Sequence, residues 1–123
     1  MEGMGLVMFN NIYKNKKVLV TGHTGFKGSW LVSWLLKLGA NVVGISKGIP
    51  TNPSMFIELE LKEKIKDYQQ DIRDLPKITK IIAIEKPDFL FHLAAQSIVS
   101  KSYDDPIETI SSNVMGTANL LEA

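Results

Sequence analysis

The chain has 123 residues, of which 45% are hydrophobic and 22% charged, and its formal net charge is +1. This length and composition are typical of one globular domain, and a near-neutral charge without a basic block gives no sign of a nucleic-acid partner. The absence of cysteine excludes disulfides, thiolate metal sites and a cysteine nucleophile. The 2 histidines lie outside any carboxylate cluster, so we expect no metal site.

The amino-terminal segment resembles neither a membrane anchor nor a secretory signal. No apolar run in the chain approaches the roughly 20 residues that a membrane span needs. Lysines follow the short apolar run Leu6–Phe9 instead of preceding it, which is the reverse of a signal peptide. We therefore expect residues 1–15 to be a flexible leader, residues 16–123 to be the domain, and the protein to be cytoplasmic, with no membrane partner.

A glycine-rich turn follows the first predicted strand. The apolar strand Lys17–Thr21 leads into three glycines spaced three apart, and the apolar helix Ser29–Leu38 comes next. This order presents backbone N–H groups to a phosphate, because glycine permits a tight turn and a close approach of the ligand. We predict a phosphate-binding turn made of Gly22, Thr24, Gly25, Phe26, Lys27 and Gly28. A purely structural turn is the alternative, in which Phe26 packs and Lys27 faces solvent; His23 is expected to be structural or exposed.

The helix after this turn is apolar on nearly every side. We therefore expect it to be buried on more than one face, with Trp30 and Trp34 packed in the core. Gly39 is expected to end it. The segments that follow are predicted as a strand at Asn41–Ser46, a loop at Lys47–Pro53, a short helix at Ser54–Leu61 and an edge strand at Ile65–Gln69.

The second half of the chain begins with a well-marked helix. Asp74 is expected to cap it, Pro76 fits its first turn, and Pro87 ends it. Its buried stripe is predicted to be Ile78, Ile81 and Ile82. A fourth strand at Asp88–Leu93 and a loop from Ala94 to Asp104 follow. The last helix begins with Asp105 as cap, Pro106 and Glu108, the residues of a capping box, and continues to the end of the chain.

Strands that alternate with helices predict an α/β fold with right-handed crossovers and a parallel sheet. We expect a Rossmann-like sheet with helices on both faces, truncated after about four strands and ordered 3-2-1-4. A ligand should then lie over the carboxyl ends of strands one and four, where the strand order reverses. The tips of these strands are Gly22–Gly28 and Leu93–Ser97.

Five short runs resemble one known family when they are taken together. They are VTGHTGFKGSWL (20–31), PTNPSMF (50–56), DIRD (71–74), FHLAAQS (91–97) and NVMGT (113–117). In this order they resemble the amino-terminal part of an extended short-chain dehydrogenase/reductase of the NAD-dependent epimerase/dehydratase family, most of all its CDP-glucose 4,6-dehydratases. The resemblance implies a lyase that removes water from a nucleotide sugar, expected to be CDP-glucose. Hydride would pass from sugar C4 to NAD and return to C6.

The resemblance also implies roles for single residues. Asp71 would meet the adenine amino group and Ile72 would pack on the ring. Cofactor contacts are further implied for Leu93, Ala94, Ala95 and Asn113, and contacts with the nucleotide sugar for Gln96, Ser97 and Val99. The alternative for Asp71 is a carboxylate that stabilises its own turn. The alternative for Leu93–Ala95 is ordinary packing, and that for Gln96, Ser97 and Val99 is a solvated loop. His92 is expected to be a core residue whose ring has its hydrogen bonds satisfied.

The residues leave the choice between NAD and NADP open. A dinucleotide site with NAD preference usually has an acidic residue about 20 positions after the turn, which binds the ribose hydroxyls. Ser46, Lys47 and Gly48 occupy these positions. A hydroxyl and an ammonium suit the 2′-phosphate of NADP, whereas the family resemblance implies NAD.

The family's catalytic Tyr-x-x-x-Lys pair is not found at a suitable place. Its spacing occurs once, at Tyr13 and Lys17, before the first strand. We therefore expect no catalytic residue in this chain, and cofactor binding without turnover. A non-catalytic dinucleotide-binding module and another sugar-nucleotide epimerase or dehydratase are the alternatives. Self-association is expected through the exposed edge of Phe89–Leu93 or through the last helix, Pro106–Ala123.

Overall fold

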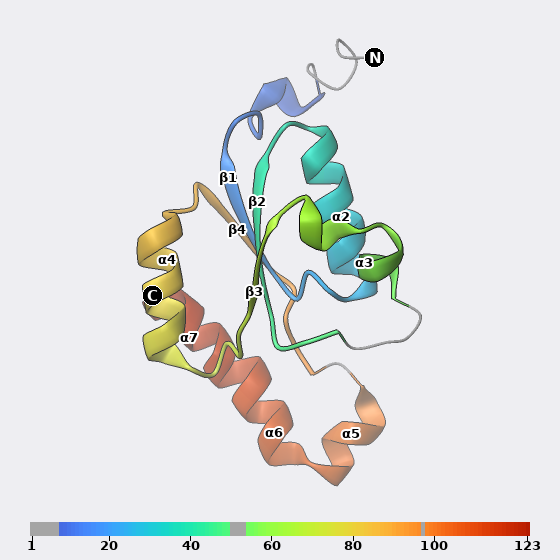
Figure 1. The fold of residues 1–123 in the computed structure, drawn as a ribbon. Helices are drawn as coiled ribbons and strands as arrows, with labels where there is room; N and C mark the ends of the chain where they lie inside the picture. Colours follow the sequence, from blue (N-terminus) through green and yellow to red (C-terminus); the bar gives the residue numbers. More distant parts are fainter. Residues whose placement is uncertain (1–7, 50–53, 97) are drawn as a thin grey trace.

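A four-stranded parallel sheet forms the centre of the computed structural model, which describes residues 8–49, 54–96 and 98–123 (Figure 1). The strands are β1 Lys17–Thr21, β2 Asn41–Ser46, β3 Lys66–Gln69 and β4 Phe89–His92. They lie in the order β3-β2-β1-β4, and every neighbouring pair is parallel. This confirms the predicted Rossmann-like topology, with β1 and β4 adjacent where the order reverses.

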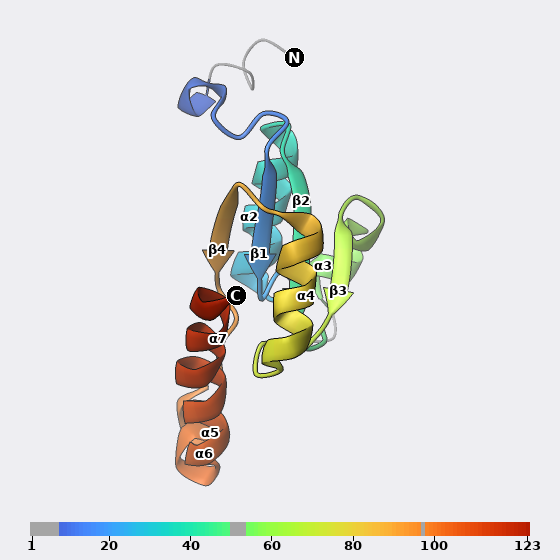
Figure 2. The same cartoon turned by 90° about the vertical axis from the view of Figure 1, so that its left-hand side faces the viewer.

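Helices cover both faces of the sheet (Figures 1 and 2). On one face lie α2 Phe26–Lys37 and α3 Met55–Glu58, and on the other lie α4 Leu75–Glu85 and α7 Gly116–Glu122. Beyond the carboxyl ends of the strands, α5 Val99–Asp104 is followed by a long helical segment that ends with α7. This segment comprises α6 Pro106–Ile110, the π-helical turn η3 Ser111–Met115 and α7 itself. Two short turns complete the fold: η1 Met8–Asn11, in which Phe9 and Asn10 have positive φ of 52° and 54°, and the 3₁₀ turn η2 Leu61–Glu63.

The alternation of side chains along β1 divides the core into two layers. Val18 and Val20 point toward α2, whereas Leu19 points toward α4, because successive strand residues face opposite sides of a sheet. The α2 layer contains Val18, Val20, Val32, Leu35, Ala40, Val42, Phe56 and Leu61. The α4 layer contains Leu19, Val43, Ile45, Ile72, Ile78, Ile81 and Leu120. The sheet is therefore packed on both faces.

The first long helix differs from its prediction in two ways. It begins at Phe26 instead of Ser29, because Gly25 is the extended N-cap and its carbonyl accepts the amide of Ser29 at 2.9 Å. It also buries one face only, so that Trp30 is 58% exposed and Trp34 48% exposed. The predicted burial on several faces, and the core position of both tryptophans, were therefore wrong. The described residues outside α2 cover its outer face only in part.

Two short helical segments also depart from the prediction. The helix expected at Ser54–Leu61 ends at Glu58, and Glu60 adopts a left-handed conformation with φ of 52° before η2. The segment expected as a loop to Asp104 contains α5, whose first turn includes a hydrogen bond from Ser102 N to Ile98 O. No residue of α5 is buried, so its sequence carries no apolar period that could have revealed it.

The helix ends follow the predicted chemistry in most places. Gly39 has a positive φ of 84°, and Asp74 caps α4 by accepting the amide of Lys77. Asp105 caps α6 by accepting the amide of Glu108 at 3.0 Å. The other half of the predicted capping box is absent, because Asp105 N donates to Lys101 O and the Glu108 carboxylate faces Lys47. Part of the predicted Lys47–Pro53 loop, residues 50–53, lies outside the described residues.

Part of the predicted leader contacts the domain. The ring centroid of Tyr13 lies 5.0 Å from that of Phe89 and 6.2 Å from that of Phe91. Phe9 contacts the indole of Trp34, with centroids 5.7 Å apart. Aromatic rings from residues 8–15 thus pack beside β4 and α2, and the flexibility expected of the leader stays a prediction.

A buried carboxylate ties α4 to the sheet. The side chain of Glu85 is 1% exposed and accepts hydrogen bonds from Lys17 Nζ at 3.1 Å and from the Tyr68 hydroxyl at 2.5 Å. Lys66 Nζ lies 2.9 Å from Oε2 of Glu85, the oxygen that also accepts the Tyr68 hydroxyl. Burial by itself would raise the pKa of Glu85, but the three donors outweigh it and lower the pKa to about 2.

The stability of the fold should therefore fall in acid. Because the folded-state pKa of Glu85 lies below its ordinary 4.5, the stabilisation is complete above that value and is lost as pH falls toward 2. The shift corresponds to stability on the order of 3 kcal/mol. Denaturant midpoints measured at about pH 6 and about pH 3 should differ strongly for the wild type and much less for Glu85→Gln. The exposed Glu63→Gln is the control; an equal acid dependence in Glu85→Gln would contradict this role.

Candidate functional site

Backbone crowding defines the glycine turn between β1 and α2. Gly22 has a positive φ of 73°, and a Cβ at this position would lie 2.7 Å from Ala94 N. A Cβ on Gly28 would overlap the carbonyl oxygen of Gly22. By contrast, a Cβ on Gly25 would meet only Gly22 O, at 3.5 Å. Gly22 and Gly28 thus permit the close packing of turn, helix and β4, whereas Gly25 lies at the open side of the turn.

Among residues 8–49, 54–96 and 98–123, no group accepts the amides of the first turn of α2, which faces this open side. The N-cap residue, Gly25, has no side chain that could accept the amides of Phe26, Lys27 and Gly28. Lys27 is exposed, as the alternative expected, whereas Phe26 is 71% exposed and does not pack as that alternative expected. The backbone amides of this turn, and the exposed ammonium of Lys27 beside them, are the groups available to an anion.

The hydroxyl of Thr24 is engaged inside the protein. It lies 2.7 Å from Ser46 Oγ and donates to the carbonyl of Gly48 at 2.5 Å. Ser46 Oγ also lies 2.7 Å from that carbonyl and accepts the amide of Gly48. Thr24 thus ties the glycine turn to the end of β2, which is a structural task that the sequence did not reveal.

A chain of hydrogen bonds links the tip of β1 to the last helical segment through β4. Thr21 Oγ1 accepts the amides of Leu93 and Ala94, so its own proton goes to His92 Nδ1 at 2.6 Å. Nε2 of His92 then donates to Thr117 Oγ1 at 2.8 Å. Burial lowers the pKa of His92, in keeping with a neutral ring of this tautomer. The expected satisfied ring of His92 is confirmed.

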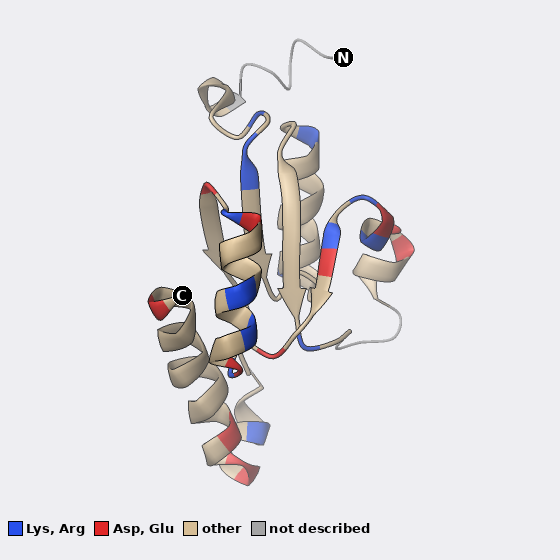
Figure 3. Cartoon of the chain, turned by 60° about the vertical axis from the view of Figure 1, so that its left-hand side comes forward, with Lys and Arg blue, Asp and Glu red and all other residues tan. Residues whose placement is uncertain are grey.

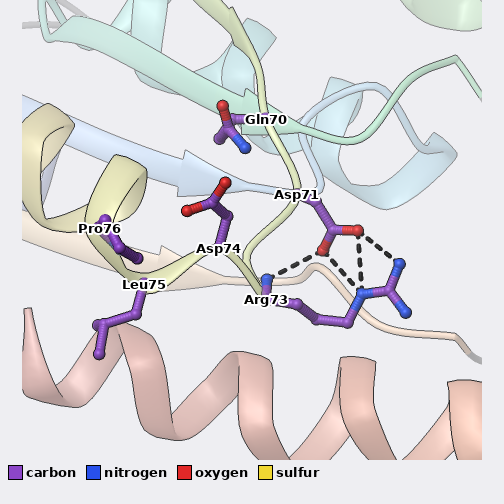
Figure 4. Close-up of a pocket in the computed structure, with 6 residues that line it drawn as sticks. All are labelled: Gln70, Asp71, Arg73, Asp74, Leu75 and Pro76. Carbon is purple, nitrogen blue, oxygen red and sulfur yellow. Dashed lines mark hydrogen bonds and ion pairs between the residues drawn. The ribbon is translucent and has the colours of Figure 1, made fainter.

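An open hollow of about 560 Å³ lies at the end of β3, lined by Gln70, Asp71, Arg73, Asp74, Leu75 and Pro76 (Figure 4). The carboxylate of Asp71 accepts hydrogen bonds from the amide of Arg73 at 2.9 Å and from its guanidinium at 2.6 Å. The side-chain hydrogen bond from Arg73 lowers the pKa of Asp71. Asp71 is thus ionised and engaged in its own turn, as the alternative reading expected, and its adenine contact stays a prediction.

The remaining predicted cofactor residues divide into buried and exposed groups. Ile72 is 6% exposed, and its side chain fills the space left by Gly116 on α7. Leu93 is 43% exposed and Ala95 is exposed, at the tip of β4. The structure brings this tip, including Ala94, directly against Gly22, whereas it directs Ile72 into the core.

Asn113 holds the segment after β4 in place. Its Oδ1 accepts the amide of Gln96 at 2.7 Å, and its Nδ2 donates to the carbonyl of Gln96 at 2.9 Å. The hydrogen-bond partner of this helical asparagine is therefore the backbone of Gln96. The side chain of Gln96 donates to Ile98 O and Thr109 Oγ1, while Val99 is 70% exposed. Ser97 lies outside the described residues, and the substrate contacts of all three stay predictions.

Charges near the end of β2 are arranged in opposite pairs. Lys47 Nζ lies 3.5 Å from the carboxylate of Glu108, and Arg73 pairs with Asp71. In the ribbon of Figure 3, basic and acidic positions are interspersed along the chain. Among the described residues there is no cluster of three potential metal ligands, and no helix is long and apolar enough to cross a membrane.

The Tyr-x-x-x-Lys spacing lies at the wrong edge of the sheet for catalysis. Tyr13 packs on Phe89, at the start of β4, and Lys17 opens β1 and binds Glu85. Both residues are thus at the amino-terminal edge, opposite the glycine turn.

Comparison with known proteins agrees with this geometry. The family model described as GDP-mannose 4,6 dehydratase matches residues 19–123. The chain belongs to this family. Its members are extended short-chain dehydrogenases/reductases of the epimerase/dehydratase type, as the sequence motifs indicated. Over 112 residues the chain is 51% identical to CDP-glucose 4,6-dehydratase of Salmonella typhimurium, a match that covers 91% of this chain and 31% of the relative.

Solved structures of family relatives share the fold. UDP-glucose 4-epimerase of Thermotoga maritima, solved with UDP-glucose, is 32% identical with a TM-score of 0.78, over 86% of this chain and 33% of that protein. UDP-glucose 4-epimerase of Thermus thermophilus, solved with NAD, is 30% identical with a TM-score of 0.76, over 86% of this chain and 32% of that protein. The chain thus spans about a third of the length of these dehydratase-family relatives.

The sequence did not reveal several residues that shape the site. Thr21, Thr117 and Ser46 join segments far apart in the chain, and hydroxyl residues carry no periodic signal of such contacts. Arg73 carried a signal that could have been used, because it lies two residues after Asp71 in a short turn, where an arginine can reach back to a carboxylate.

The two crowded glycines should tolerate substitution much less than the open one. Gly28→Ala would place a methyl group on the Gly22 carbonyl and should cost roughly 2–4 kcal/mol of folding free energy. Gly25→Ala, at φ −76°, should cost less than about 1 kcal/mol. Urea unfolding of both variants checks this, and equal losses would contradict the packing described.

Proposed function

We propose that this chain is the NAD-binding, amino-terminal part of a nucleotide-sugar 4,6-dehydratase, a lyase that acts on CDP-glucose in the cytoplasm. The observation that carries the proposal is the uncapped first turn of α2, which stands beside Gly22 and the tip of β4. The 51% identity to a CDP-glucose 4,6-dehydratase supports the substrate. Relatives solved with NAD and with UDP-glucose support a dinucleotide and a nucleotide sugar as ligands.

The residues present fit a dinucleotide. A pyrophosphate needs backbone donors without a side chain above them, and the open position of Gly25 meets this need. The helix dipole of α2, which has 12 residues, adds favourable potential for an anion at the same place. Leu93 and Ala95, exposed at the tip of β4, line the next part of the proposed path. Asp71 stands at the end of β3, where the adenine would lie.

The charge pairs near β2 favour NAD over NADP. A 2′-phosphate needs an available cation, but Lys47 faces Glu108 and Arg73 is held by Asp71. These four groups sum to zero charge, and Ser46 is engaged with Thr24 and Gly48. An uncharged ribose hydroxyl therefore suits this neutral cluster better than a dianion does.

When bound, the nicotinamide would accept a hydride from the sugar and return it. The chain's own residues would bind and orient: the turn holds the phosphates, and Asn113 fixes the segment of Gln96 that leads toward the sugar. His92 is held neutral between Thr21 and Thr117 and supports the β4 tip without transferring protons. No described residue is assigned as catalytic.

Titration with NADH and NADPH tests the cofactor site. The wild-type chain should bind NADH more tightly than NADPH in calorimetry or in cofactor fluorescence. Gly25→Glu should weaken NADH binding about tenfold or more, since a carboxylate would repel the phosphates, and tenfold equals about 1.4 kcal/mol. It should still fold, because the site of its Cβ is open.

Ala83→Glu is the matched control for this titration. It makes the same charge change at an exposed position of α4 and should leave binding unchanged. No binding of either dinucleotide to the wild type would contradict the cofactor proposal, and tighter binding of NADPH would contradict the choice of NAD.

We further propose that the chain self-associates. Within the described part of the chain, β4 has one neighbouring strand, and Leu90 on this edge is 40% exposed. The last helical segment offers a second apolar surface, on which Ile107 is 79% and Leu121 81% exposed. Apolar surface of this kind commonly marks an interaction site.

Sedimentation velocity should detect species larger than the monomer. Leu90→Lys should reduce association through the β4 edge, and Ile107→Lys should reduce association through the helical surface. Ile84→Lys, on α4 and 58% exposed, provides the control and should change nothing. A strictly monomeric wild type would contradict the proposal.

A further inference from the structure

The imidazole of His23 lies inside the protein although it belongs to the glycine turn. Its side chain is 0% exposed, and its Nε2 lies 2.5 Å from Oδ1 of Asp67 on β3. Because a carboxylate only accepts, Nε2 carries the proton of this bond. The ring also stands edge-on to Phe56, with centroids 5.2 Å apart. The glycine turn is therefore connected to β3, the strand at the edge of the sheet.

The sheet provides space for this ring at one position. A Cβ on Gly44 of β2 would overlap Cγ and Cδ2 of His23 and lie 2.6 Å from its Nδ1. Any residue other than glycine there would displace the ring. β2 thus lets the side chain of His23 cross it and reach Asp67 on β3, whose side chain is 4% exposed.

The backbone of His23 supports the first turn of α2. Ser29 Oγ donates to the carbonyl of His23 at 3.0 Å. A Cβ on Gly28 would lie 2.8 Å from the Cα of His23, so the helix rests directly on this residue. His23 therefore joins the amino-terminal turn of α2 to β2 and β3.

A purely packing role would not need this polar side chain. Nδ1 of His23 has no hydrogen-bond partner among the described residues, and burying a polar ring with one nitrogen unpaired costs free energy. An apolar side chain would fill the same volume without that cost. What the pair with Asp67 adds is one defined ring orientation, since the hydrogen bond has a single acceptor in reach.

We propose that His23, through Asp67, is a positioning residue that fixes the amides of Phe26, Lys27 and Gly28 relative to the sheet and so sets the affinity for the dinucleotide phosphates. The part concerning affinity rests on the proposed function. The ordering of the turn does not, because it concerns the contacts of the chain alone.

Two measurements test the proposal: amide hydrogen exchange at Gly25 and Ser29, whose amides donate to Gly22 O and Gly25 O on either side of the free amides, and the dissociation constant of NADH. His23→Ala and Asp67→Ala should each speed exchange in the turn and weaken NADH binding about tenfold, the scale of one lost buried charge-assisted bond. The double variant should be no worse than either single one, because both remove the same contact. Asp67→Asn, which keeps an acceptor oxygen, should restore most of the protection; it also tests the proposal if the alanine variants do not fold.

Tyr68→Phe is the control for a general loss of stability. Tyr68 neighbours Asp67 on β3 but faces the other layer, where its hydroxyl donates to Glu85. This variant should lower the stability of the fold while leaving the turn amides and NADH binding unchanged.

The outcomes separate the two proposals. Wild-type exchange at Gly25 and Ser29 in His23→Ala, or equal effects from Tyr68→Phe, would overturn the positioning role. If the wild type binds no NADH, the proposed function falls, and the exchange rates alone decide whether His23 orders the turn.

Discussion

The close approach of three backbone segments at Gly22 is the constraint on which this structure depends. The turn after β1, the start of α2 and the tip of β4 meet there at distances that leave no room for a Cβ on Gly22 or Gly28. Parallel strands bring their carboxyl ends to one edge, and the order β3-β2-β1-β4 puts the reversal at this point. Because the helix begins where the strands end, its free amides are directed at the same edge.

Polar side chains then hold this edge from three directions. Thr21 and His92 connect β1 and β4 to Thr117, Thr24 connects the turn to the end of β2, and His23 reaches β3. None of these bonds is local in the sequence. Together they leave the amides of α2 as the groups free for an anion, while most nearby side chains are already engaged.

Several ionised side chains outside this cluster are also paired with groups of opposite charge. Glu85 is buried because three donors surround it at the opposite edge, and Asp71 is held by Arg73 in the turn after β3. At the end of β2, Lys47 and Glu108 offset each other. The result is an edge with little net charge, at which the dipole of α2 is the attraction proposed for a phosphate.

The amino-acid sequence by itself determined the strands, their order, the caps at Asp74 and Asp105 and the position of the glycine turn, since each depends on local periodicity or on one residue's backbone preference. Only the tertiary structure decided which face of α2 is buried, that α5 is helical, and which partners Thr24, His23 and Ile72 have. Burial and hydrogen bonding of these residues depend on segments that are distant in sequence. Trp30 and Trp34 show this limit, because their apolar character predicted a core position and both are about half exposed. Whether another segment covers the outer face of α2 depends on the tertiary structure, and no local sequence pattern carries that information.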